Sequence, residues 1–234
     1  MCGISGIYNC SDRNINANKI IENIIKLQDR RGPDDRGIWQ SECKKITLGH
    51  NRLSIIDLTD KARQPLVSKD NNLVITFNGE IYNYKEIKNE LSKNNVLFKS
   101  NSDTEVILES YKYWGVEFVK KLRGMFAFAI WDNNKKKLLL ARDPFGIKPL
   151  YYFKKNNILF FASQVKSILS IDNLSFEKSK RSVLDYYLWG NIQEPLTLYK
   201  DIYSLERGTV KIIDGKLNET TYEYANIKDA ILNS

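Results

Sequence analysis

The residue best placed for covalent chemistry in this sequence is Cys2, which follows Met1 directly. A methionine that precedes a small residue such as cysteine is normally removed by an aminopeptidase. Cys2 would then carry both a thiol and a free α-amine, and an α-amine titrates at about 7.7 to 8.0 in model compounds. One residue would thus supply a nucleophile and its base, as in enzymes with an N-terminal threonine nucleophile.

The alternative, a cysteine paired with a histidine, depends on His50, the only histidine in the chain. We interpret His50 as a strand-end residue with a structural hydrogen bond. The other thiols, Cys10 and Cys43, form no CxxC pair with each other or with Cys2. We therefore expect no disulfide framework and no metal site, and we expect Cys10 and Cys43 to be inert.

The bulk composition is that of a soluble globular protein of 234 residues, with 42% hydrophobic and 27% charged residues. No apolar run approaches the roughly 20 residues of a membrane span, and no signal-peptide pattern begins the chain. We expect a cytoplasmic protein without a membrane partner. The net charge of +8 comes from scattered lysines, so a solvated surface is favoured over a nucleic-acid patch.

Helical periodicity appears in four segments. In 18–30 it places Ile20, Ile21, Ile24, Ile25 and Leu27 on one apolar face. The other three segments are 84–94, 100–115 and 115–124. Segment 100–115 carries a capping-box pattern near its start, Ser102 to Glu105. Shorter helices are expected in 164–170 and 178–190.

Strand patterns occupy much of the remaining chain. Segment 45–58 predicts two strands with a tight link, and 72–83 predicts a strand that runs into a turn at Asn78-Gly79. Segment 125–143 predicts a β-hairpin, and further strands follow between 144 and 224. Adjacent hairpins and clustered helices indicate an α+β fold with antiparallel sheets covered by helices. The common nucleotide-binding glycine loops are absent.

Several motifs occur together and in order: MCGISGIY, RRGPDDRG, LGHNRLSIIDL, FNGEIYN, SNSDTEVIL, LRGMFAFAIWD and ARDPFGIKPLYY. This set resembles class II glutamine amidotransferases, in particular the N-terminal glutaminase domain of glutamine-hydrolysing asparagine synthetases. The resemblance implies the four-layer αββα fold of N-terminal-nucleophile hydrolases, with two facing antiparallel sheets between helical layers. It also implies a glutaminase domain over 1–215, with 216–234 as its C-terminal end and the start of a connection to a synthetase domain.

The resemblance implies hydrolysis of L-glutamine to L-glutamate and ammonia through a Cys2 thioester. The Asn78 side chain and the Gly79 backbone N–H correspond to the oxyanion site. The alternative for Asn-Gly alone is a plain turn. Arg52 corresponds to the residue that binds the substrate carboxylate, since its guanidinium fork suits that group. The backbone of the following residues is expected to line the site: Leu53, Ser54, Ile55 and Ile56.

Asp103 corresponds to the residue that binds the substrate ammonium, with Glu80 nearby. The alternative for Asp103 is a carboxylate in the first turn of a helix, where it interacts favourably with the helix dipole, and this is compatible with binding the ammonium. The alternative for Arg52 is a surface ion pair. In the last motif we expect Arg142 and Asp143 to form a structural pair and Lys148 to face a partner domain. The chain departs from the family at Arg30, where relatives usually have histidine.

The family's ATP-binding SGGxDS loop is absent from these 234 residues. We therefore expect no cofactor in this chain, with ATP and magnesium required only in a synthetase domain that amidates aspartate. One alternative keeps the glutaminase but delivers ammonia to a sugar uronate. Another is an inactive regulatory or binding module, which the joint presence of the site residues disfavours. The resemblance leaves a homodimer open.

Overall fold

Two six-stranded antiparallel sheets form the centre of the computed structural model, which describes residues 1–54 and 59–226. The first sheet has the strand order β10 (Ile202–Ser204), β8 (Tyr151–Lys155), β9 (Ile158–Ala162), β1 (Gly3–Asn9), β3 (Ile46–Arg52) and β2 (Asp35–Gln40). The second has the order β12 (Glu219–Glu223), β11 (Thr209–Ile213), β7 (Lys137–Arg142), β6 (Gly124–Asp132), β5 (Leu73–Ile81) and β4 (Leu66–Val67).

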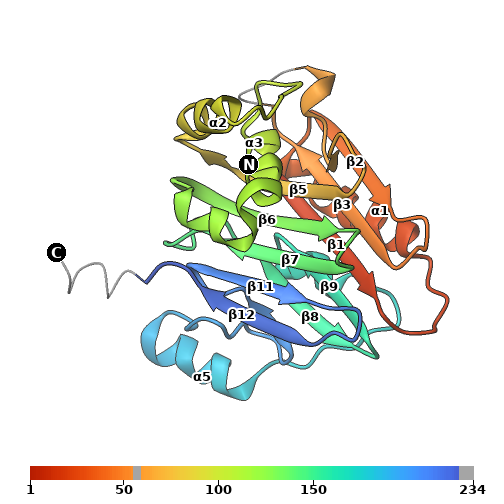
Figure 1. The fold of residues 1–234 in the computed structure, drawn as a ribbon. Coiled ribbons are helices and arrows are strands. Elements are labelled where there is room, and N and C mark those ends of the chain that lie inside the picture. Colours follow the sequence, from red (N-terminus) through yellow and green to blue (C-terminus); the bar gives the residue numbers. More distant parts are fainter. Residues whose placement is uncertain (55–58, 227–234) are drawn as a thin grey trace.

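In the part of the chain that the structure describes, five α-helices accompany the sheets: α1 (Ala17–Leu27), α2 (Tyr84–Lys93), α3 (Asp103–Trp114), α4 (Val165–Leu169) and α5 (Lys180–Trp189). Short 3₁₀ helices are formed by Asp29–Arg31, Asp60–Ala62 and Gly115–Lys121. Figure 1 shows α2 and α3 over the end of the second sheet that holds β5 and β6. The helix α5 lies apart from them, and its Tyr187 and Trp189 are largely exposed.

Apolar clusters of described residues separate the layers. One lies between α2 and α3 and the second sheet, and includes Phe77, Val106 and Phe128. Another packs α1 and α4 on the first sheet, and a third, around Tyr8 and Trp131, fills the space between the two sheets. Because each sheet has one helix-covered face and one face against the other sheet, the expected four-layer αββα fold is confirmed.

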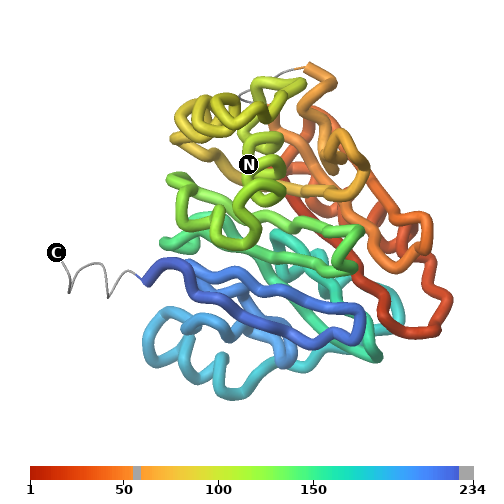
Figure 2. Tube along the Cα trace, in the orientation of Figure 1, coloured from red at the N-terminus to blue at the C-terminus, as the bar shows by residue number. Residues whose placement is uncertain are grey.

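The strand β1 explains how the start of the chain is held. It pairs with β3 on one side and β9 on the other, and all seven of its residues are buried. Alternate side chains serve the two faces: Ile4 and Tyr8 point between the sheets, while Ile7 packs toward α1. Figure 2 shows this red N-terminal segment between strands from later in the chain. Cys2, the residue before β1, is therefore attached to a central strand rather than to a frayed end.

The described elements correct four details of the sequence prediction. The strand β5 continues through Asn78 and Gly79 to Ile81, so no turn occurs there. Leu27 is 42% exposed and does not belong to the buried face of α1. The helix expected in 115–124 is a 3₁₀ helix. Of the two strands expected in 45–58, the first is β3; residues 53 and 54 are not in a strand, and 55–58 lie outside the described residues.

The C-terminal strand β12 pairs with β11 along its whole length. It extends the second sheet through Glu223, inside the segment 216–234 that was expected to hold the C-terminal end of the domain. The hairpin of β6 and β7 has the predicted antiparallel pairing. Among the described residues, no helix is long and apolar enough to cross a membrane.

Candidate active site

The Cys2 thiol lies beside the main chain that leaves β3. Its Sγ is 3.4 Å from the backbone nitrogen of Leu53 and 3.6 Å from the carbonyl oxygen of the same residue. Burial raises the pKa of the thiol, because the thiolate is poorly solvated there. The thiol therefore needs a base to reach its nucleophilic form near neutral pH.

The sequence motif RRGPD holds Cys2 from the other side. The Nε of Arg31 donates a 2.9 Å hydrogen bond to the carbonyl oxygen of Cys2. Further along the motif, the Asp34 nitrogen bonds to the carbonyl oxygen of Arg52, and an Asp34 carboxylate oxygen accepts from the Ser54 nitrogen at 2.8 Å. Arg31 was missed by sequence reasoning, which used this motif only for the family resemblance and examined only the change at Arg30.

A cavity of about 250 Å³ opens at Cys2, between the ends of the two sheets. It is lined by seven of the residues singled out from the sequence: Cys2, Arg52, Leu53, Asn78, Gly79, Glu80 and Asp103. Ser54 follows Leu53 but is not part of the lining, and the expected contributions of Ile55 and Ile56 fall outside the described residues. The fold thus gathers residues from β3, β5 and α3 around one thiol.

The centre of β5 offers an unsatisfied hydrogen-bond donor to this cavity. Asn78 is 1% exposed, and its Nδ2 has no hydrogen-bond partner among the described residues. Such a buried, unpaired amide is uncommon and points to a ligand group that completes it. At the next residue, Gly79, a Cβ would lie 2.3 Å from the Met125 carbonyl oxygen. Glycine is needed here for close strand packing, and not for the turn that the sequence suggested.

Groups of opposite charge, Arg52 and Asp103, both line the cavity. Arg52 is 8% exposed at the end of β3, and its guanidinium donates to the carbonyl oxygen of Thr59 at 3.4 Å. A few residues on, Gln64 bonds to Thr104 on the first turn of α3, beside Asp103. The Asp103 carboxylate accepts from the nitrogen of Ile81 at 3.1 Å.

Burial raises the pKa of Asp103 to about 6, since the charged carboxylate loses water contacts. A cation bound in the cavity would stabilise the charged carboxylate in place of the lost water. The capping box expected at this helix start is half formed: Ser102 accepts from the Glu105 nitrogen, while the Glu105 carboxylate binds the nitrogens of Lys99 and Ser100. Ser102 therefore caps the helix, while the Asp103 carboxylate lies in the first turn close to the backbone N–H groups of Asp103 and Thr104, so the expected place near the helix dipole is compatible with a role in the cavity.

The single histidine serves the structure. His50 is 1% exposed, and its Nε2 lies 3.0 Å from the carbonyl oxygen of Phe77, so the ring donates this bond. Burial lowers the pKa of His50 to about 4. The residue lies within β3 rather than at its end, but the interpretation as a structural hydrogen bond is confirmed. His50 does not line the Cys2 cavity.

Two expectations for the motif ARDPFGIKP are wrong. Arg142 does not pair with Asp143; its guanidinium binds Glu194 at 2.6 Å. Asp143, fully buried, instead accepts hydrogen bonds from backbone nitrogens of its own loop and of Phe126. Lys148 is only 6% exposed and lines the Cys2 cavity, so its side chain does not face outward to a partner.

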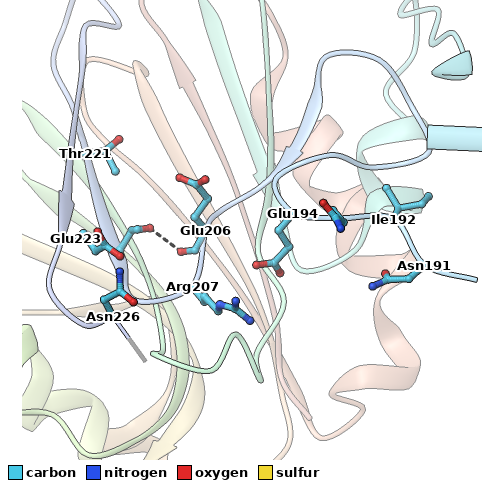
Figure 3. Close-up of a pocket in the computed structure, with 10 residues that line it drawn as sticks. Asn191, Ile192, Glu194, Glu206, Arg207, Thr221, Glu223 and Asn226 are labelled. Carbon is cyan, nitrogen blue, oxygen red and sulfur yellow. Dashed lines mark hydrogen bonds between the residues drawn. The ribbon is translucent and has the colours of Figure 1, made fainter. Parts of the chain in front are cut away.

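A larger hollow of about 860 Å³ lies far along the second sheet, beside β11 and β12. Figure 3 shows Glu206 and Arg207 between the β12 side chains Thr221 and Glu223 and the loop that carries Glu194. Its lining contains no cysteine, and the Thr209 hydroxyl within it already bonds to the Glu206 carbonyl oxygen at 2.6 Å. Unlike this hollow, the smaller Cys2 cavity contains a buried thiol together with the unpaired Nδ2 of Asn78.

This arrangement of a thiol, an unpaired amide and charged groups of both signs suits the binding of an amino acid whose side chain carries an acyl group. A family model described as "Glutamine amidotransferase domain" matches residues 1–224. The chain belongs to this family. The resemblance to class II glutamine amidotransferases is therefore confirmed, and the family's enzymes include glutamine-hydrolysing asparagine synthetases.

Individual relatives of this glutamine amidotransferase domain support the assignment to this family. The chain is 40% identical over 232 residues to asparagine synthetase [glutamine-hydrolyzing] 1 of Bacillus subtilis, covering 97% of this chain and 36% of that protein. It is 36% identical to a putative asparagine synthetase 2 of Methanocaldococcus jannaschii, covering 98% and 47%. The chain thus spans about a third to a half of the length of these relatives.

A solved structure supports the fold. Glutamine phosphoribosylpyrophosphate amidotransferase from B. subtilis superposes with a TM-score of 0.70 at 20% identity, covering 96% of this chain and 49% of that one. At this identity the likeness concerns the fold alone. It agrees with the four layers described above, and the sequence relatives do not favour the uronate and inactive-module alternatives.

Proposed function

We propose that this chain hydrolyses L-glutamine to L-glutamate and ammonia through a thioester on Cys2. The thiol adds to the γ-amide carbon, and the C–N bond breaks as the leaving nitrogen takes a proton and departs as ammonia. Water then adds to the thioester carbon, the C–S bond breaks, and glutamate leaves. Both steps pass through a tetrahedral oxyanion that requires hydrogen-bond donors.

The observation that carries this proposal is the unpaired Nδ2 of Asn78 in the wall of the Cys2 cavity. Leaving a buried donor unsatisfied costs about 1 to 3 kcal/mol. A developing oxyanion would complete the hydrogen bonding of Asn78, together with the backbone N–H of Gly79. The donor would then act more strongly on the transition state than on the neutral amide, which is the condition for catalysis.

The base in this proposal is the α-amine of Cys2. In the sequence described, Met1 precedes Cys2, so that nitrogen belongs to a peptide bond. Met1 is 55% exposed and lines the cavity. Its removal by an aminopeptidase would therefore leave space in the cavity for the substrate. Activity on this account begins with removal of Met1.

The other end of glutamine is zwitterionic, and the cavity offers complementary groups. Arg52 would bind the α-carboxylate with the fork of its guanidinium, and Asp103 would bind the α-ammonium, with Glu80 nearby. Leu53 also lines the cavity, and contact of the substrate with the backbone of Ser54, Ile55 and Ile56 stays a prediction. No cofactor is required for these steps.

For the fate of ammonia, we favour delivery to a synthetase domain that amidates aspartate with ATP and magnesium. Support comes from the relatives named asparagine synthetase, of which this chain matches a part. A cytoplasmic location and a homodimer remain predictions of the same proposal.

The direct test compares the chain, prepared without Met1, with its Cys2→Ala variant. We expect equimolar release of glutamate and ammonia from glutamine, and its complete loss in Cys2→Ala with an unchanged melting temperature. Cys43→Ala, at an exposed thiol, is the matched control and should keep full activity. Ammonia release that survives in Cys2→Ala would overturn the proposed function.

A further inference from the structure

The helix α5 presents its large apolar and aromatic side chains to solvent. The residues that are more than half exposed, called here the exposed α5 residues, are Leu184, Tyr186, Tyr187, Leu188 and Trp189. Tyr187 reaches 83% and Trp189 74%. No α5 residue belongs to the apolar clusters of the described chain. Contiguous exposed side chains of this kind mark a surface that another domain or protein covers.

The helix is held by its ends and not by its sides. It has 10 residues, and isolated helices shorter than about 12 to 15 residues are marginal in water. The Ser179 side chain caps its first turn, and the Gly190 nitrogen bonds to the Tyr186 carbonyl oxygen at 2.8 Å. The Ser179 nitrogen bonds to the Leu198 carbonyl oxygen at 2.9 Å, which fixes the start of the helix. A partner would therefore meet a helix that is already in place, so little ordering is lost on binding.

A second pair of exposed apolar side chains lies in the loop after β7. Phe145 is 65% exposed and Ile147 54%. The fully buried Asp143 carboxylate accepts from the nitrogens of both residues at 3.0 Å each. Their exposure is therefore a property of a fixed loop and not of a frayed one.

One guanidinium joins this loop to the segment that follows α5. Arg142 donates to the Gly146 carbonyl oxygen at 2.7 Å and to a Glu194 carboxylate oxygen at 2.6 Å. Gly146 lies at the centre of the loop, and Glu194 lies shortly after the end of α5. The same loop contributes Lys148 to the lining of the Cys2 cavity. The surface therefore extends from α5 to the edge of the cavity in which ammonia would form.

The end of the described chain lies beside the same helix. The hollow near β11 and β12 is lined by Asn191 and Ile192, just after α5, and also by Asn226, the last described residue. Figure 3 shows Asn226 and Asn191 on opposite sides of this hollow. A domain joined to the chain after residue 226 would thus start close to α5. Since the chain spans only about a third to a half of the length of the asparagine synthetases that it matches, those proteins have room for such a domain.

We propose that the exposed α5 residues, together with Phe145 and Ile147, form the docking surface for a synthetase domain. This inference rests on the proposed delivery of ammonia to such a domain. Tyrosine, tryptophan and phenylalanine are enriched in the cores of protein interfaces, and their burial there would supply the packing that α5 lacks. The partner contact expected for the motif ARDPFGIKP thus falls on Phe145 and Ile147, and not on the buried Lys148. Ammonia would then meet the synthetase domain at the edge of the Cys2 cavity.

The experiment compares the rate of maleimide labelling of introduced cysteines in two proteins. One is this chain alone, and the other is a hybrid in which this chain replaces the matched residues of asparagine synthetase 1 of Bacillus subtilis. In Tyr187→Cys and Phe145→Cys we expect labelling at least tenfold slower in the hybrid, because the synthetase domain covers these positions. Leu97→Cys is the matched control and should label equally in both proteins. Leu97 is 75% exposed and follows α2, which lies at the opposite end of the molecule from α5 (Figure 1).

Mass spectrometry of the labelled peptides distinguishes each introduced cysteine from the native ones. Melting curves and ammonia-dependent formation of asparagine from aspartate and ATP check that the hybrid is folded. If it is not, the same hybrid built on the Methanocaldococcus jannaschii relative takes its place.

Three results would overturn the docking surface: equal labelling of Tyr187→Cys in the chain and the hybrid, equal slowing of Leu97→Cys, or slow labelling of the chain alone that becomes faster on dilution. The last result would assign the surface to a second copy of this chain. Labelling requires no turnover. A chain without glutaminase activity would therefore refute the proposed function, while the labelling rates would still decide whether α5 is a docking surface.

Discussion

Arg31 donates a hydrogen bond of 2.9 Å from its Nε to the carbonyl oxygen of Cys2. The bond fixes the peptide that follows the nucleophile, while Leu53 contacts the thiol itself. Arg31 thus acts on the position of Cys2, and not on the substrate. The adjacent Arg30, where the chain departs from its family, is exposed.

Arg31→Ala should lower kcat by roughly tenfold to a hundredfold and leave glutamine KM within about threefold, because misplacement of a nucleophile acts on the chemical step. Steady-state kinetics of Arg31→Ala and Arg30→Ala form the matched comparison. The exposed Arg30 should be replaceable without effect. Equal kinetics for the two variants would remove the positioning role from Arg31.

Asn78→Ala should separate activity from stability. Because Nδ2 has no partner in the free protein, its removal breaks no hydrogen bond of that donor and should leave the melting temperature within a few degrees. Loss of an oxyanion donor should reduce kcat by about 10² to 10³. A large fall in melting temperature with normal kcat would show instead that Asn78 is a structural residue.

The raised pKa of Asp103 predicts the acid limb of the pH profile. Below about pH 6 the carboxylate takes up a proton and no longer attracts the α-ammonium of glutamine. Protonation of the Cys2 amine already lowers kcat/KM below about pH 8. The slope of log kcat/KM against pH should therefore steepen from one to two near pH 6, and should stay near one in Asp103→Asn.

The same shift has a consequence for stability. The folded pKa of Asp103, about 6, is above the ordinary value of 3.8, so the fold favours the protonated form. Stability from this group is present at low pH and is lost as the pH rises through this interval. Asp103→Asn should thus be more stable than the parent at pH 7, by at most about 3 kcal/mol. Equal or lower stability would contradict the burial cost assigned to this carboxylate.

His50→Gln tests whether the histidine takes part in catalysis. The glutamine amide can donate to the Phe77 carbonyl oxygen, so kcat should fall by less than about threefold, with a lower melting temperature from imperfect packing. The folded pKa of His50, about 4, is below the ordinary 6.5, so its contribution to stability is lost as pH falls through that range. The variant should lack this acid-dependent loss. A loss of kcat comparable to that of Cys2→Ala would reinstate a cysteine–histidine mechanism.

Much of the fold and of the site could be predicted, because short-range patterns determine them. Apolar periodicity located α1, and two apolar runs on either side of a polar turn located the β6–β7 hairpin. The ordered motifs brought together seven residues that line one cavity. These features depend on local residue types and on a family resemblance that the comparisons confirm.

The failures share a different physical origin, since each depends on contacts between distant segments. Asn78-Gly79 is typical of a turn, but pairing with β6 keeps both residues in a strand. Arg142 and Asp143 are adjacent and oppositely charged, yet a distant Glu194 and the backbone of Phe126 take their hydrogen bonds. Only the folded loop shows that Lys148 is buried beside Cys2.

The central claim is that the α-amine of Cys2 activates its own thiol. The most direct measurement fuses a cleavable tag to Cys2, in place of Met1, and follows glutaminase activity before and after a protease exposes Cys2, with intact mass recorded at both points. We expect no hydrolysis of glutamine by the uncleaved protein and full activity once Cys2 is the first residue. Equal activity before and after cleavage would contradict the account, because the amine would then be dispensable.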